Sequence, residues 1–291
     1  MKSEKKRVGT KARIRAEKGR ERRIATAIFL TLILFCVALS AYFGYTILSP
    51  SPDMSVIKPT RQFNPENANP ELKAAIADQL SLTFPNQAFI QAAVTILEVA
   101  NYSIDYYSGE SVTVEFYRNL PAHGYKVILL RVHSAGQALW GGENLQLFTS
   151  ETYSSNKHVT EQLAGQVGTV KYNLEDKIMY FGIPPTFVQK CMNSRFKNTV
   201  VIAMGCDGLS GTKMASAFIE KGASAYVGWN GSVSVSQTDA ATTQILQHLA
   251  TDGQTIRQAI GNTIKEVGAD PVCNNILEYY PLGSWEYTIQ R

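Results

Sequence analysis

The sequence predicts an α/β domain with a mostly parallel sheet of about six strands, preceded by one transmembrane helix. Three observations lead to this prediction. Apolar segments with helix-like and strand-like periodicity alternate along most of the chain. Two strand-like segments end in chemically reactive residues, His133 and Cys206. An uncharged apolar run, residues 24–48, precedes all of them.

The first 23 residues are strongly basic. They hold eleven Lys and Arg against three Glu, a net charge of +8, whereas the remainder, with 17 basic and 21 acidic residues, is net −4. Basic tails bind anionic lipid headgroups or nucleic acid phosphates, or serve only as solvated topology signals. Because this tail adjoins an apolar run and lacks aromatic residues for base stacking, we expect membrane lipid as its partner and no nucleic acid.

Residues 24–48 carry no charge, and about 20 apolar residues suffice to cross a bilayer as a helix. We expect an uncleaved signal anchor. A cleaved signal peptide is the alternative, with Ala38-Leu-Ser-Ala41 as a small-residue cleavage site. Since Lys and Arg are retained on the cytoplasmic side, the chain is predicted to be a single-pass membrane protein with a cytoplasmic N-terminus and an extracytoplasmic C-terminal domain.

Residues 49–70 are rich in Pro, Asn and Ser, and we expect a stalk there. Residues 71–291 are enough for one domain with a full hydrophobic core. The first half of this domain alternates between strand and helix, over residues 74–82, 86–100, 103–107, 111–120 and 126–132. This alternation predicts parallel strands, because parallel neighbours need crossover connections.

A change of pattern follows His133. Residues 136–153 carry Gly141-Gly142 between two apolar stretches, which predicts a hairpin-like insertion. Beyond it, helices are expected over 184–192, 212–221, 240–250 and 254–267, and strands over 199–204, 223–227 and 279–288.

His133 and Cys206 are the main indication of function. In open α/β sheets, ligands bind at the carboxyl ends of the strands, so these two residues can meet above neighbouring strands. A Cys beside a His is a pattern of nucleophilic catalysis. Taken singly, a Cys at such a position is usually a small buried residue and a His a hydrogen-bonded structural group.

Three stretches resemble the caspase-like cysteine peptidases, the clan of caspases, gingipains, separases and CHAT domains. They are the strand leading to His133-Ser-Ala-Gly136, the strand leading to Met204-Gly-Cys206-Asp-Gly-Leu209, and the helix, Gly and strand of residues 215–230. The resemblance covers about residues 74–235. It implies a caspase-like three-layer sandwich and a cofactor-free endopeptidase that cleaves protein or peptide substrates. With the predicted topology, this activity would lie at the cell surface.

The resemblance also implies roles for individual residues. Cys206 would be the nucleophile, and His133 the base that takes its proton and later protonates the leaving amine. Backbone groups near Ser134, Gly136 and Gly205 would stabilise the oxyanion. By family position, Asp207 is a candidate for recognising a basic substrate residue, and Trp229 and Asn230 are candidates for walling the substrate pocket.

Two alternatives remain open at this point. Many relatives have Gly directly after the catalytic His, whereas this chain has Ser134. That departure favours a catalytically inactive caspase-like domain used as a surface binding or scaffold module. An unrelated doubly wound ligand-binding or sensor domain is a more distant alternative, with Asp78 and Asn86 as its polar cluster. No metal-ligand spacing, P-loop or dinucleotide fingerprint is present, and whether Cys191 and Cys273 pair is left open.

Overall fold

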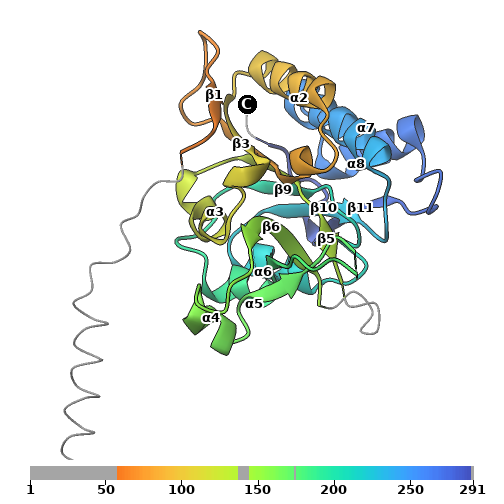
Figure 1. Cartoon of the computed structure of the whole chain (residues 1–291). Coiled ribbons are helices and arrows are strands. Elements are labelled where there is room, and N and C mark those ends of the chain that lie inside the picture. Colours follow the sequence, from red (N-terminus) through yellow and green to blue (C-terminus); the bar gives the residue numbers. More distant parts are fainter. Residues whose placement is uncertain (1–57, 137–143, 174, 290–291) are drawn as a thin grey trace, which may run out of the picture. The chain divides into compact units, whose positions relative to one another are not determined.

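The computed structural model describes residues 58–136, 144–173 and 175–289. They form an α/β domain built on a mostly parallel seven-stranded sheet (Figure 1). The predicted basic tail and transmembrane helix lie outside the described residues. Within the described ranges, no helix is both long and apolar enough to cross a membrane.

The large sheet has the strand order β1-β3-β2-β4-β9-β10-β11. Strands β2, β3, β4, β9 and β10 run parallel, and β1 and β11 are antiparallel at the two edges. The bounds are β1 Arg61–Phe63, β2 Lys73–Asp78, β3 Ser103–Ser108, β4 Val127–Arg131, β9 Val200–Ala203, β10 Ala225–Trp229 and β11 Leu277–Tyr280.

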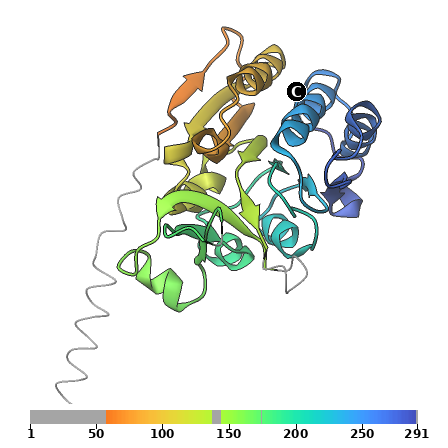
Figure 2. The same cartoon turned by 45° about the vertical axis from the view of Figure 1, so that its right-hand side comes forward.

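Helices cover both faces of this sheet. Its strands alternate side chains between two cores: Ala74 and Ile76 pack with α2, α7 and α8, whereas Ala75 and Ala77 pack with α3, α5 and α6. Figures 1 and 2 show α2, α7 and α8 together on one side. The helix bounds are α2 Gln87–Val99, α3 Val114–Asn119, α4 Val159–Leu163, α5 Pro185–Lys190, α6 Lys213–Glu220, α7 Val235–Leu246 and α8 Ile256–Val267.

Local sequence explains where the main helices begin. The side chain of Asn86 accepts a hydrogen bond from the Phe89 N–H, which caps α2 at its expected start. Thr255 and Gln258 form a capping box at the start of α8. The capping residues are polar and take no part in the apolar periodicity. They define the helix starts more closely than the periodicity does.

Two predicted strands have different ends in the structure. The segment predicted as a strand over residues 74–82 leaves the sheet after Asp78, and Gln79–Leu82 forms a 3₁₀ turn, η1. The Ser81 hydroxyl, which donates to the Asp78 carbonyl, stabilises this turn. The last strand ends at Tyr280 and is followed by the turn η6, Leu282–Ser284, so residues 281–288 do not extend the sheet.

Strand β1 lies inside the segment predicted as a stalk. Arg61 pairs with Tyr106, and the Gln62 amide donates to the Asp105 carboxylate at 2.8 Å. The strand has only three residues and is largely polar, so apolar patterning does not reveal it. The folded domain therefore begins earlier than residue 71.

A second, antiparallel sheet occupies the region predicted as a hairpin-like insertion. Its order is β5-β6-β8-β7, from β5 Ser134–Ala135, β6 Gln146–Thr152, β8 Tyr180–Ile183 and β7 Gly168–Val170. Strand β6 lies inside the predicted insertion, but its antiparallel partner β5 precedes it, and residues 137–143, which include Gly141-Gly142, lie outside the described residues. The predicted 240–250 helix starts earlier, at Val235, and continues into a π-turn, η5 Gln247–Thr251.

Candidate functional site

His133 and Cys206 follow neighbouring parallel strands at equivalent positions. In the pairing of β4 with β9, Leu130 lies opposite Ala203, and each reactive residue comes three positions after that pair. The carboxyl ends of parallel strands share one edge of a sheet. The register thus brings the two predicted catalytic residues to the same edge.

Both residues line one cavity of about 470 Å³. Its walls come from the η1 turn, from the ends of β4 and β9, and from the start of α7: Leu80, Phe84, Val132, His133, Met204, Gly205, Cys206, Val233, Ser234, Val235, Ser236 and Thr238. Catalytic pockets are commonly concave and largely apolar, with a few polar groups. This cavity fits that description.

The imidazole of His133 is held on several sides. Its Nε2 lies 3.0 Å from the Thr83 hydroxyl, and its backbone N–H donates to Gln79 Oε1. Its ring packs against the rings of Phe84 and Tyr172, with centroids 6.0 and 5.1 Å away. Burial, and then the charge of Arg131, lower the pKa of His133 to about 4. The imidazole is therefore neutral near pH 7, the form that accepts a proton.

The thiol of Cys206 is half-buried and hydrogen-bonded to the backbone of Val233. Its Sγ accepts a hydrogen bond from the Val233 N–H at 3.5 Å and donates to the Val233 carbonyl at 3.7 Å. Burial raises the pKa of the Cys206 thiol and outweighs the lowering effect of the Val233 N–H. The site holds a neutral thiol and a neutral imidazole whose hydrogen bonds go to Val233 and Thr83 rather than to each other.

The predicted oxyanion region is tightly packed. The Ser134 hydroxyl donates a hydrogen bond to the Cys206 carbonyl, which joins the two strand ends directly. A Cβ on Gly205 would overlap Ser134 Oγ and the Val132 carbonyl, so only glycine fits there. Ser134 also pairs with Leu147 across β5 and β6. Gly136 is half-buried and precedes residues outside the described ranges.

The three residues predicted for the substrate pocket are not part of this cavity lining. Asp207 has a left-handed backbone, and its carboxylate accepts a hydrogen bond from Ser210. Trp229 is 1% exposed in the core, with its indole N–H donating to Thr238. Asn230 turns toward β11 and donates to Glu278 at 3.1 Å. Trp229 contacts the lining through Thr238, and Asp207 directly follows the lining residue Cys206 in the chain.

Sequence reasoning missed the residues that form most of the wall. Phe84 comes from the turn after β2, Val233 from the loop after β10, and Val235 is the first residue of α7. The only sequence signal for them is an apolar side chain in an otherwise polar loop. Phe84 keeps 51% of its surface exposed, which is unusual for a large aromatic residue.

A buried ion network lies directly behind His133. Arg131 is fully buried, and its guanidinium donates two hydrogen bonds to Asp239 and one to Asp78. The Asn86 amide donates to the same Asp239 carboxylate. Asp78 and Asn86, the polar cluster of the sensor alternative, are thus partnered inside the fold.

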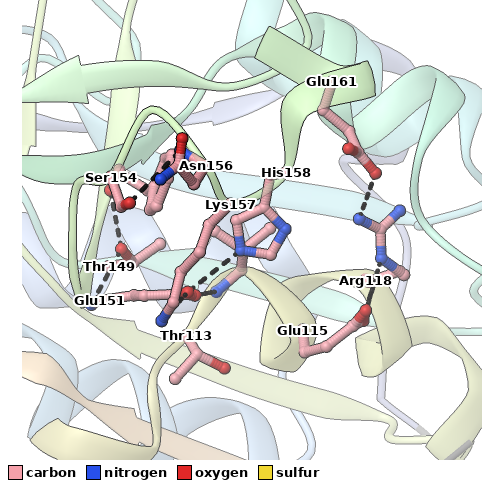
Figure 3. A network of polar contacts seen from close by, with 12 residues as sticks. Thr113, Glu115, Arg118, Thr149, Glu151, Ser154, Asn156, Lys157, His158 and Glu161 are labelled. Carbon is pink, nitrogen blue, oxygen red and sulfur yellow. Dashed lines mark hydrogen bonds and ion pairs between the residues drawn. The ribbon is translucent and has the colours of Figure 1, made fainter. Parts of the chain in front are cut away.

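A second polar network fastens the small sheet to its helices (Figure 3). Glu151 on β6 meets Lys157 and His158, while Arg118 on α3 joins Glu115 to Glu161 of α4. All of these charges have partners of opposite sign. The network therefore stabilises the packing of the small sheet against α3 and α4.

Among the residues that the structure covers, no group of three or more His, Cys, Asp or Glu is arranged to hold a metal. Cys191 and Cys273 are both free thiols, and the buried Cys191 donates to Gln166 Oε1 at 3.1 Å. The pairing left open by the sequence is absent from this structure.

No protein-family model and no curated protein matched the chain in sequence comparisons.

Proposed function

We propose that the chain is a membrane-anchored cysteine endopeptidase of the caspase-like kind, with Cys206 as nucleophile and His133 as base. One observation carries the proposal: the register of β4 and β9 brings both residues to one cavity. The mostly parallel sheet with helices on both faces is compatible with the three-layer sandwich that the resemblance implies.

The chemistry starts from a neutral pair. His133 exchanges its contact with Thr83 for one with Cys206 and takes the thiol proton as sulfur attacks the peptide carbonyl. The imidazolium then protonates the leaving amine as the C–N bond breaks, which leaves a thioester. Water, deprotonated by His133, hydrolyses the thioester, and the thiol recovers its proton.

Location follows from the N-terminal sequence. The uncharged run 24–48 would anchor the chain in lipid, the basic tail would stay on the cytoplasmic side, and the peptidase domain would face outward. A reporter fused after Arg291 tests this arrangement: accessibility only from outside supports it, and accessibility from the cytoplasm contradicts it.

The enzymatic proposal is tested with acyloxymethyl-ketone probes on the full chain in detergent. Such probes alkylate an activated cysteine, so labelling should map to Cys206 and be lost in both Cys206→Ala and His133→Ala. Cys273→Ala is the matched control, because Cys273 is an exposed thiol, and labelling should persist in it. Equal labelling of the wild type and His133→Ala would mean that His133 does not activate Cys206, which would contradict the proposed dyad.

The second candidate is a catalytically inactive domain that binds a partner at the surface. It is favoured by the hydrogen bonds that Thr83 and Val233 make to the two reactive groups, and by Ser134 after the His. A folded, reduced sample that no probe labels would support this candidate over the peptidase.

A further inference from the structure

The cavity beside Cys206 is walled mainly by apolar side chains. Half of the twelve lining residues are aliphatic, aromatic or thioether side chains: Leu80, Phe84, Val132, Met204, Val233 and Val235. Phe84, one of these six residues, keeps 51% of its surface exposed. The exposed part of the lining therefore includes a large apolar side chain.

Charged groups near the cavity are already satisfied by the protein. Arg131 is fully buried and held by Asp78 and Asp239. Asp270 accepts hydrogen bonds from both the N–H and the hydroxyl of Ser234. Among the described residues that line the cavity there is no Asp, Glu, Lys or Arg, and His133 is the only titratable base.

Polar side chains of the lining also have hydrogen-bond partners within the protein. Thr238 accepts from the Trp229 indole N–H, and Ser234 is bonded to Asp270. Asp207, the sequence-based candidate for recognising a basic substrate residue, bonds Ser210 and does not line the cavity. A charged substrate side chain would find no ion partner among these lining residues.

We infer that the cavity takes an apolar side chain, of the size of Leu, Met or Phe, from the residue that precedes the scissile bond. This inference rests on the proposed function. Burying such a side chain is favourable, whereas a charged one would lose its hydration without gaining a partner. One methylene more or less in a hydrophobic pocket already changes discrimination by about 10- to 200-fold.

The first experiment compares probe side chains on the full chain. Acyloxymethyl ketones carrying Leu, Met or Phe before the reactive group should label Cys206 at least about tenfold faster than those carrying Arg, Lys, Asp or Asn. Faster labelling by a charged probe would overturn the apolar preference and leave the peptidase proposal standing. Absence of labelling by every probe would contradict both the apolar preference and the peptidase proposal.

The second experiment places a charge at the cavity mouth. Phe84→Glu should lower the ratio of Leu-probe to Arg-probe labelling by about tenfold, because the carboxylate offers an ion partner. The ratio cancels any change in overall reactivity. Leu82→Glu is the matched control, since Leu82 is similarly exposed but outside the lining, and its ratio should stay as in wild type. An unchanged ratio in Phe84→Glu would contradict the assignment.

Discussion

The imidazole Nε2 of His133 lies 3.0 Å from the hydroxyl of Thr83, on the turn that leaves β2. This nitrogen is therefore engaged by a residue 50 positions earlier in the chain, although Cys206 lines the same cavity. Catalysis that uses this nitrogen requires the contact with Thr83 to break. Thr83 is consequently the residue whose replacement most directly tests how the site is activated.

Thr83→Val should increase Cys206 labelling by a Leu probe by about fivefold, because one hydrogen bond of about 1 kcal/mol no longer restrains the imidazole. Valine keeps the shape of threonine, and position 83 is exposed, so the fold should be retained. Thr95→Val on the exposed face of α2 is the control and should change nothing. A slower rate in Thr83→Val would mean that Thr83 orients the base for catalysis.

Alkylation of Cys206 by iodoacetamide should rise steadily with pH through pH 9 and beyond. Its pKa is raised from 9.0 by burial, and the lowered pKa of His133 leaves no imidazolium to stabilise a thiolate near neutrality. Mass spectrometry of the Cys206 peptide gives the rate at each pH. A plateau between about pH 5 and 8 that disappears in His133→Ala would instead reveal a preformed ion pair.

Gly205→Ala should destabilise the fold by about 1 to 3 kcal/mol, because the new methyl group would overlap the Val132 carbonyl and Ser134 Oγ. Thermal unfolding of the full chain in detergent measures the change. Gly261→Ala is the matched control: that glycine lies within α8 with open space around it, so alanine should stabilise by up to about 1 kcal/mol. Equal stability of the two variants would contradict the packing described here.

Arg131→Met should destabilise by about 3 to 5 kcal/mol, since it leaves Asp78 and Asp239 buried without their cation. The exposed Arg257, which lies over the Trp285 ring, offers a comparison. Arg257→Met should cost no more than about 1 kcal/mol. Urea titration of both variants checks the order, and a similar loss in each would argue against a buried triad.

Glu151 should make the free energy of unfolding depend on pH in the acid range. Burial would raise its pKa, but hydrogen bonds and charges from His158 and Lys157 outweigh this and lower it to about 2, from 4.5. As the pH falls, Glu151 is therefore protonated in the unfolded chain before it is protonated in the folded one. Roughly 2 to 3 kcal/mol of stability, fully present above about pH 4.5, is lost as the pH falls toward 2. Glu151→Gln should flatten this dependence, whereas the exposed Glu110→Gln should preserve it.

Much of the central fold could be predicted from sequence because its signals are local. The apolar runs of β4 and β9, the Asn86 cap of α2 and the alternation that requires crossovers all lie within short windows. Strand β1 and the second sheet could not be predicted in detail, because their strands are short and partly polar. Their stability comes from partners distant in sequence, such as Asp105 for Gln62.

For the candidate site, the sequence by itself determined that His133 and Cys206 follow two apolar, strand-like runs and that an uncharged run of membrane-spanning length precedes the domain. Only the tertiary structure decided that β4 and β9 are neighbours in register, that Thr83 and Val233 bond the two reactive groups, and that Phe84 rather than Trp229 lines the cavity. The physical reason is the distance along the chain over which each feature is set. Strand ends follow from local apolar patterning, whereas hydrogen-bond partners and cavity walls depend on chain segments that are brought together only by packing of the whole domain.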